Sequence, residues 1–190
     1  MAKAKKKIGV IDFVVLGVLV VCLVLSIVGL TIDQWTTTEE VFGETMDVPF
    51  SEYSDAVVEK NEAKDEINEA LGDDIMGGLD DMFGDSELVQ DAKAEEAKLD
   101  AMVAFGYITV ILVAVTLVLY VLKMFLKAGL FRFLVLVAGV LTLISGVLAI
   151  AMTAAFCGEA LLVGAGAALL AVGGMLGGIA GGASFFLSKK

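Results

Sequence analysis

The sequence has no histidine, one proline, one tryptophan and only two cysteines in 190 residues. Without histidine, the chain has no imidazole to serve as a general acid or base, a metal ligand or a haem ligand. Neither Cys22 nor Cys157 has a base nearby in the sequence, and no glycine-rich phosphate loop follows a strand pattern. We therefore expect no catalytic residue, no cofactor and no dedicated metal site, and we predict that the protein is not an enzyme.

Charged residues are absent from long stretches of the chain. Hydrophobic residues make up 58% of the sequence and the mean hydropathy is +0.90, whereas a soluble domain is about 45–50% apolar. A bilayer core about 30 Å thick requires roughly 20 apolar residues in each helical span. Four runs are long enough, and they predict spans at residues 8–32, 101–122, 130–156 and 160–187. The predicted fold is an all-α integral membrane protein with a four-transmembrane-helix bundle.

The segments between these runs differ in charge. Basic residues concentrate in the tails 1–7 and 188–190 and around the connector 123–129, which all lie on one side of a four-span chain. By the positive-inside rule, both termini are cytoplasmic. Residues 33–100 and the short turn 157–159 then lie outside, and they hold every acidic residue except Asp12. This topology predicts a protein of the plasma or cell membrane.

Residues 33–100 read as an acidic, mainly helical outer cap. Residues 36–53 alternate polar and apolar side chains, which suits a short strand or an extended segment. A helix is predicted from an N-cap at Ser54 to a stop at Gly72. From Ser86 onward nothing interrupts a helical pattern before the second span, which predicts one continuous helix. The aspartates here lack the spacing of a calcium-binding loop, so we expect only diffuse cation attraction.

Two features of the cap are candidates for interaction. Trp35 follows the first span and predicts either an aromatic anchor at the lipid–water boundary or a residue that recognises a partner. The second candidate is an amphipathic element that either packs within the cap or contacts a partner. Its apolar residues recur at helical spacing: Ile75, Met76, Leu79, Met82 and Phe83.

Small residues mark the faces along which the last two predicted spans pack. Helices in lipid approach closely where such residues line one face. The main seam includes Gly139, Gly146, Gly164, Gly174, Gly178 and Gly181. A second ridge, formed by Gly173, Gly177 and Gly182, is left for the first span or for another subunit. We predict a tight antiparallel pair.

Polar residues are scarce inside the predicted spans. Apart from Arg132, which we count with the connector, Asp12 is the only charged residue within them, and it lies close to the basic tail, so we expect it to reach the interface or to pair with a lysine. The other spans have no acid, base or histidine in their interiors, which argues against proton-coupled transport. The polar candidates for lining a wet path are few: Thr109, Thr116, Thr142, Ser145 and Thr153.

The layout of four spans, a long first outer loop and a brief second one resembles that of claudin and peripheral-myelin-type tetraspan proteins. Trp35 matches the first tryptophan of their outer-loop pattern, whereas the Gly-Leu-Trp motif and the paired cysteines of that family are absent from residues 36–100. The resemblance implies a four-helix bundle that presents an outer domain, for adhesion or as an auxiliary subunit. The family forms a small sheet in this loop.

These patterns favour a non-catalytic structural, adhesion or accessory interaction subunit. Its partners would be membrane lipids and other membrane proteins or copies of itself, with no nucleic acid. The competing function is a homo-oligomeric channel or pore whose acidic vestibule concentrates cations.

Overall fold

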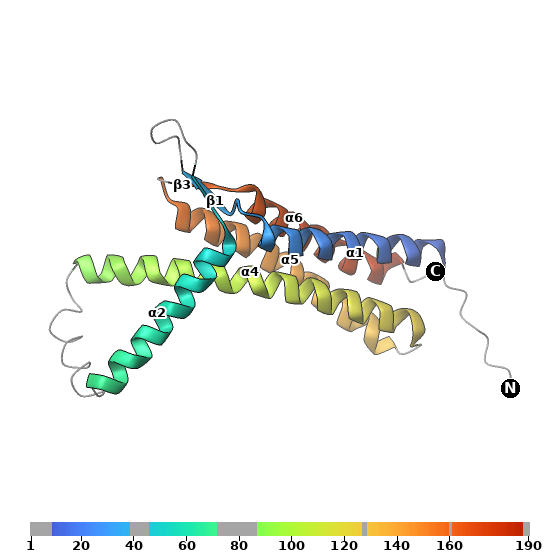
Figure 1. Ribbon diagram of the computed structural model, residues 1–190. Coiled ribbons are helices and arrows are strands. Elements are labelled where there is room, and N and C mark those ends of the chain that lie inside the picture. Colours follow the sequence, from blue (N-terminus) through green and yellow to red (C-terminus); the bar gives the residue numbers. More distant parts are fainter. Residues whose placement is uncertain (1–8, 39–45, 72–86, 127–128, 160, 188–190) are drawn as a thin grey trace.

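The computed structural model describes residues 9–38, 46–71, 87–126, 129–159 and 161–187. Within these residues, the four long helices α1, α4, α5 and α6 lie side by side as a bundle, and α2 crosses α4 outside it (Figure 1). The bundle helices are α1 (Val10–Thr31), α4 (Glu87–Phe125), α5 (Gly129–Cys157) and α6 (Ala165–Leu187). Each is long and apolar enough to cross a membrane. The start of α1 and the end of α6 lie at the same end of the bundle (Figure 1).

A small antiparallel sheet covers the other end, which we call the sheet end. It contains β1 (Thr36–Thr38), β2 (Asp47–Val48) and β3 (Leu161–Val163) in the order β2-β1-β3. Thr36 pairs with Val48 on one side and with Val163 on the other. The sheet therefore joins the chain that follows α1 to the chain that precedes α6.

β3 corrects the predicted boundary of the last span. The sequence analysis assigned residues 160–187 to one helix, but Leu161–Val163 are extended and α6 begins at Ala165. The backbone amides of Gly164 and Gly166 donate to the carbonyls of Trp35 and Gln34, both at 2.8 Å. A short apolar strand cannot be told from a helix by hydropathy alone, and its pairing partner lies far away in the sequence.

The helix α2 spans Phe50–Leu71, so it begins four residues before the predicted N-cap. Pro49 immediately precedes it, and proline is tolerated at a helix start because its ring fixes φ and its missing N–H is not needed there. Ser54 lies inside the helix and its hydroxyl contacts the Tyr107 hydroxyl at 2.8 Å. The predicted continuous helix through the second span is confirmed, because α4 runs unbroken from Glu87 to Phe125.

Lys123 also departs from the prediction, which placed it in a connector. It lies within α4 and is only 4% exposed. Its ammonium donates to the Ser184 carbonyl at 2.8 Å and hydroxyl at 3.0 Å, and it lies 5.0 Å from the centre of the Tyr120 ring. The Tyr120 hydroxyl donates to the Asp12 carboxylate at 3.3 Å. Tyr120 is thus a partner of Asp12, and this network joins α1, α4 and α6. The lysines of the tail 1–7 that were expected to pair with Asp12 lie outside the described residues.

The bundle core depends on close backbone contact between α5 and α6. A Cβ atom built on Gly178 would lie 2.5 Å from the Leu143 amide nitrogen and 2.6 Å from the Gly139 carbonyl oxygen. One on Gly146 would lie 2.9 Å from the Met175 amide nitrogen. Real side chains essentially never approach so closely, so only glycine permits this spacing. Small residues here bring the two backbones close enough for dispersion forces to hold the helices together.

The second glycine ridge divides between two neighbours. A Cβ on Gly173 would meet the Cys22 carbonyl oxygen of α1 at 2.8 Å, whereas the nearest atom to one on Gly182 belongs to Leu136 of α5, at 4.0 Å. Gly29 of α1 makes a matching close approach to α6, where its Cβ would lie 2.6 Å from the Leu170 amide nitrogen. Glycines therefore allow both α1 and α5 to pack closely against α6.

Candidate functional site

The candidate site is built on Trp35 at the sheet end. Its ring is fully buried, its indole N–H donates to the Gly29 carbonyl at 2.5 Å, and its centre lies 4.5 Å from that of the Phe50 ring. Both interpretations from the sequence required an exposed ring, so the structure corrects them. Trp35 is a core residue that joins α1, the sheet and the first turn of α2.

Further aromatic contacts fix the start of α2. Phe50 stands edge-on to Tyr107 of α4, with ring centres 5.1 Å apart, and Tyr53 stands edge-on to Phe156 of α5, at 5.3 Å. The Tyr53 hydroxyl also shares a hydrogen bond with that of Thr36 in β1. Burial raises the pKa of Tyr53 although this hydrogen bond lowers it, so the phenol is neutral at pH 7. The base of α2 is therefore held by three helices and the sheet.

Because Trp35 is the only tryptophan, its fluorescence reports its burial directly. We predict a blue-shifted emission and little quenching of the purified protein by acrylamide, with full quenching after denaturation. An indole at the lipid–water boundary would instead be readily quenched by acrylamide. Strong quenching of the folded protein would contradict the buried position.

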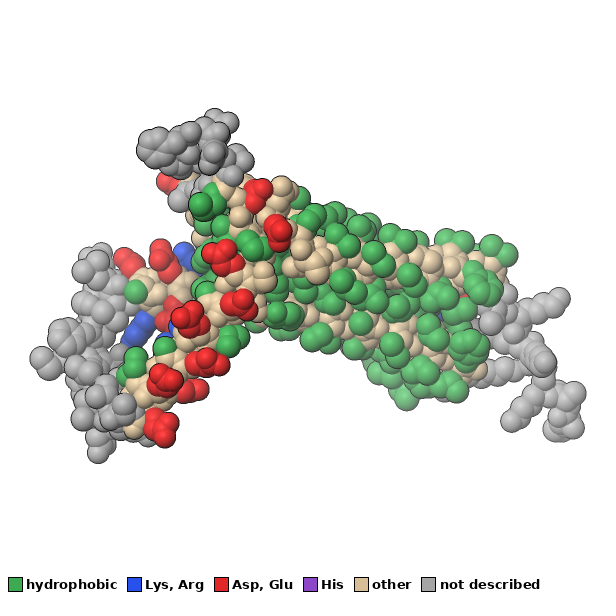
Figure 2. Space-filling model, in the orientation of Figure 1, with side chains coloured by type: hydrophobic (Ala, Val, Ile, Leu, Met, Phe, Trp, Pro, Cys, Tyr) green, Lys and Arg blue, Asp and Glu red, His purple; other side chains and the backbone are tan. Residues whose placement is uncertain are grey.

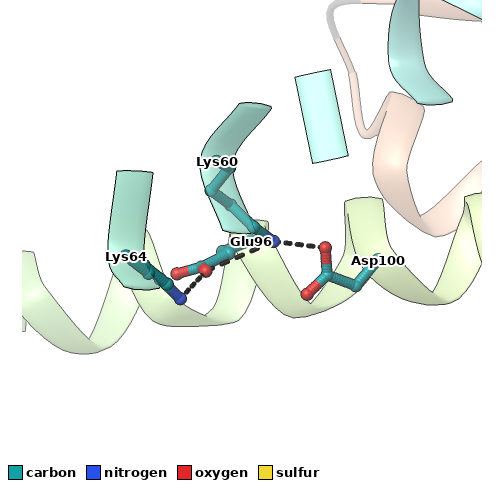
Figure 3. A network of polar contacts seen from close by, with 4 residues as sticks. All are labelled: Lys60, Lys64, Glu96 and Asp100. Carbon is teal, nitrogen blue, oxygen red and sulfur yellow. Dashed lines mark hydrogen bonds and ion pairs between the residues drawn. The ribbon is translucent and has the colours of Figure 1, made fainter. Parts of the chain in front are cut away.

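Lysines of α2 hold it against α4 farther out (Figure 3). Lys60 donates to Asp100 and lies 3.3 Å from Glu96, and Lys64 donates to the same Glu96. We call these four residues the clamp. Partial burial lowers the pKa of Lys60, but its hydrogen bonds to Asp100 and Glu96 outweigh this effect and raise it above the ordinary value. Lys60 therefore remains charged throughout the physiological range.

The opposite face of α2 carries the most distinctive surface of the described residues. Its members are all exposed carboxylates at spacings of three and four residues, and we call them the acidic stripe: Glu52, Asp55, Glu59, Glu62, Glu66 and Glu69. Acidic side chains recur along the length of α2 (Figure 2). Like charges at these spacings destabilise a helix, and no ion pair among the described residues involves the stripe. The base and the clamp thus hold a helix with a self-repelling outer face.

Comparison with protein-family models, with curated proteins and with solved structures finds no match to this chain. The site is therefore interpreted from its own geometry.

The remaining predicted residues fall into two groups. The apolar patch of Ile75, Met76, Leu79, Met82 and Phe83 lies outside the described residues. All six seam glycines contact neighbouring elements, but Gly164 does so in the connection between β3 and α6, where its Cβ would collide with the Gln34 carbonyl. It makes room for the sheet and does not contribute to the pairing of α5 with α6.

Sequence reasoning missed the acidic stripe and the clamp. The signal for the stripe was present, because the carboxylates recur with helical spacing once the helix is known to begin at Phe50. The clamp had no such signal, because its lysines and its acids lie 32 or more residues apart.

Removing the clamp should free the outer part of α2 while leaving the bundle intact. We predict that Lys60→Met with Lys64→Met broadens the distance distribution between spin labels at Glu66→Cys and Asp91→Cys. Exposed ion pairs contribute about 0.2–1 kcal/mol each, so the thermal midpoint should change little. Pulsed electron spin resonance gives the distances, and the native cysteines should resist labelling because both are buried.

Lys98→Met, a lysine of α4 outside the clamp, is the control and should leave the distribution narrow. A group whose pKa rises on folding contributes stability below its unfolded pKa and loses it as the pH rises through the folded value. The Lys60 contribution should thus persist at neutral pH and vanish only above the ordinary lysine value of 10.5. An unchanged distribution in the double variant would contradict the clamp.

Proposed function

We propose that the protein is a non-catalytic four-span membrane protein that acts as a structural, adhesion or accessory interaction subunit. In this proposal α2 presents the acidic stripe to a basic surface of a partner outside the cell membrane, and both termini are cytoplasmic. The observation that carries the proposal is the acidic stripe on a helix fixed at its base. The carboxylates of the acidic stripe repel one another while the helix is unbound. A basic partner would neutralise them, and the relief of this repulsion favours binding.

The sheet supports the claudin-like layout as part of this proposal. That family forms a small sheet in its first outer loop, and here β1 and β2 follow α1 directly. Trp35 stands at the start of this sheet. The chain departs from the family in its missing cysteine pair and in the long helix α2, so the proposal concerns the architecture and a role in contacts between proteins.

The interior of the bundle does not favour a pore through a single copy. The Thr109 and Ser145 hydroxyls share a hydrogen bond of 2.7 Å, and those of Thr116 and Thr142 share one of 2.9 Å. Thr153 donates to the Ala149 carbonyl. These were the candidates for lining a wet path, and all five are buried and hydrogen-bonded. A conducting path would have to run between copies of the chain.

The first test is the composition of the particle after gentle extraction from its own membrane. Native mass spectrometry should show the chain bound to other proteins, and the Glu59→Gln, Glu66→Gln variant should lose them. The control variant Asp65→Asn, Asp91→Asn removes the same charge outside the acidic stripe and should retain them. A closed homo-oligomer that conducts ions would overturn the proposal in favour of a pore, and retention of partners by both variants would exclude the stripe as the contact.

A further inference from the structure

An open pocket of about 320 Å³ lies between the outer part of α4 and the end of α5. This volume is at the lower end of the range for ligand sites. The charged side chains in its lining are Glu95, Lys98 and Glu159, and the apolar ones include Ala155, Phe156 and Leu161. The pocket shares no residue with the clamp or with the acidic stripe.

The lining of the pocket carries more negative charge than positive charge. Glu95 and Glu159 contribute two carboxylates, and the last residues of α5 add the negative end of a 29-residue helix. Gly158, in the left-handed conformation with φ of 56°, ends that helix and returns its N–H to the Ala154 carbonyl. The carbonyls of the α5 residues that follow Ala154 have no N–H donor farther along the helix. Lys98 is the single cation in the lining.

The position of the pocket along the bundle restricts its ligand. Lys98 precedes the start of the apolar run of α4 at Ala101 by less than one helical turn, and α5 ends its apolar run at Cys157. Both helices thus change from apolar to charged at the level of the pocket. If the bundle spans a membrane, as proposed above, this level is the headgroup layer. The apolar side chains of the lining then lie next to the upper part of the lipid chains.

We propose that the pocket binds one phospholipid whose headgroup carries both an ammonium and a phosphate. The ammonium lies toward the two carboxylates and the end of α5, and the phosphate lies toward Lys98. A headgroup with only a negative charge would meet two carboxylates and a helix C-terminus, so it binds less well. The same chemistry occurs in free phosphoethanolamine, which lacks the acyl chains that contact Phe156 and Leu161.

The test is a titration of the purified full chain, followed by native mass spectrometry. Phosphatidylethanolamine should bind with a stoichiometry of one, at least about tenfold more tightly than phosphatidylglycerol and than free phosphoethanolamine. Glu95→Gln with Glu159→Gln should weaken this binding about tenfold or more, and so should Lys98→Gln, because each removes charge-assisted contacts. Equal binding of the two lipids, or variants that bind like the original chain, would overturn the proposal. Equal binding of free phosphoethanolamine would overturn the lipid as the source.

Two controls show whether a loss of lipid binding comes from the pocket or from misfolding or lack of membrane insertion. Asp91→Asn removes a carboxylate of α4 outside the pocket and should leave binding unchanged, and the helix content of every variant shows whether it folds. Extraction of the membranes with alkaline carbonate tests insertion independently. Protein released by carbonate would overturn both proposals, whereas retained protein without lipid selectivity would overturn only the pocket.

Discussion

Gly178→Ala is expected to destabilise the protein strongly although it adds a single methyl group. The new Cβ would lie 2.5 Å from one backbone atom of α5 and 2.6 Å from another, and backbone atoms cannot move aside as a side chain can. The helices must separate along their whole seam, and overpacking of this kind costs about 1–3 kcal/mol or more. The thermal midpoint in detergent, followed by size-exclusion chromatography, should fall by roughly 2–12 °C.

The matched control is Gly17→Ala in α1, where an added Cβ meets nothing within 4 Å. Alanine has a higher helix propensity than glycine by about 1 kcal/mol, so this variant should be as stable as the original or slightly more stable. A lower thermal midpoint for Gly178→Ala together with an equal or higher midpoint for Gly17→Ala would show that the loss arises from the contact between α5 and α6, because both variants add the same methyl group. Equal midpoints for the two variants would show that α5 and α6 do not pack as described.

Trp35→Ala is expected to have the second large effect, centred on the sheet end. Truncating a buried tryptophan typically costs about 3–5 kcal/mol, and here it also empties the space beside Phe50 and leaves the Gly29 carbonyl without its donor. The base of α2 should loosen, which limited proteolysis of residues 50–71 would detect as faster cleavage. The bundle helices should remain protected.

Trp35→Phe separates the two contributions of this residue. The ring still fills most of the space, but the hydrogen bond to Gly29 is lost, which should cost about 1–3 kcal/mol for a buried carbonyl left unpaired. Cleavage of α2 should therefore be intermediate. If Trp35→Ala were cleaved as slowly as the original chain, the aromatic base would not be what holds α2.

The bundle was predictable because its signals are local. Each of the four helices contains an apolar stretch long enough to cross a membrane, and the continuous course of α4 follows from the absence of a breaker after Ser86. The glycine spacing in α5 and α6 likewise indicated a close pair, since small residues on one face have few other uses in a lipid-length helix.

The site was not predictable to the same degree because its contacts are distant in the sequence. Nothing near Leu161 indicates a strand, since its partner Thr38 lies more than a hundred residues earlier. The burial of Trp35 depends on Phe50 and on glycines of two other helices, and a tryptophan beside an apolar run is typical of an interface anchor. The helical periodicity of the carboxylates becomes meaningful only once the start of α2 and its inner face are known.

The pairing of β1 with β3 sets an order for biogenesis. Thr36 leaves the ribosome long before Val163, and at roughly 5–20 residues per second the interval between them is about 6–25 s. Throughout that time the backbone groups of β1 that later face β3 have no strand beside them, and Trp35 lacks its contacts with α6. Closure of the sheet end is therefore a late event in synthesis, and a chain that stalls before α6 would present an unfinished surface to membrane quality control.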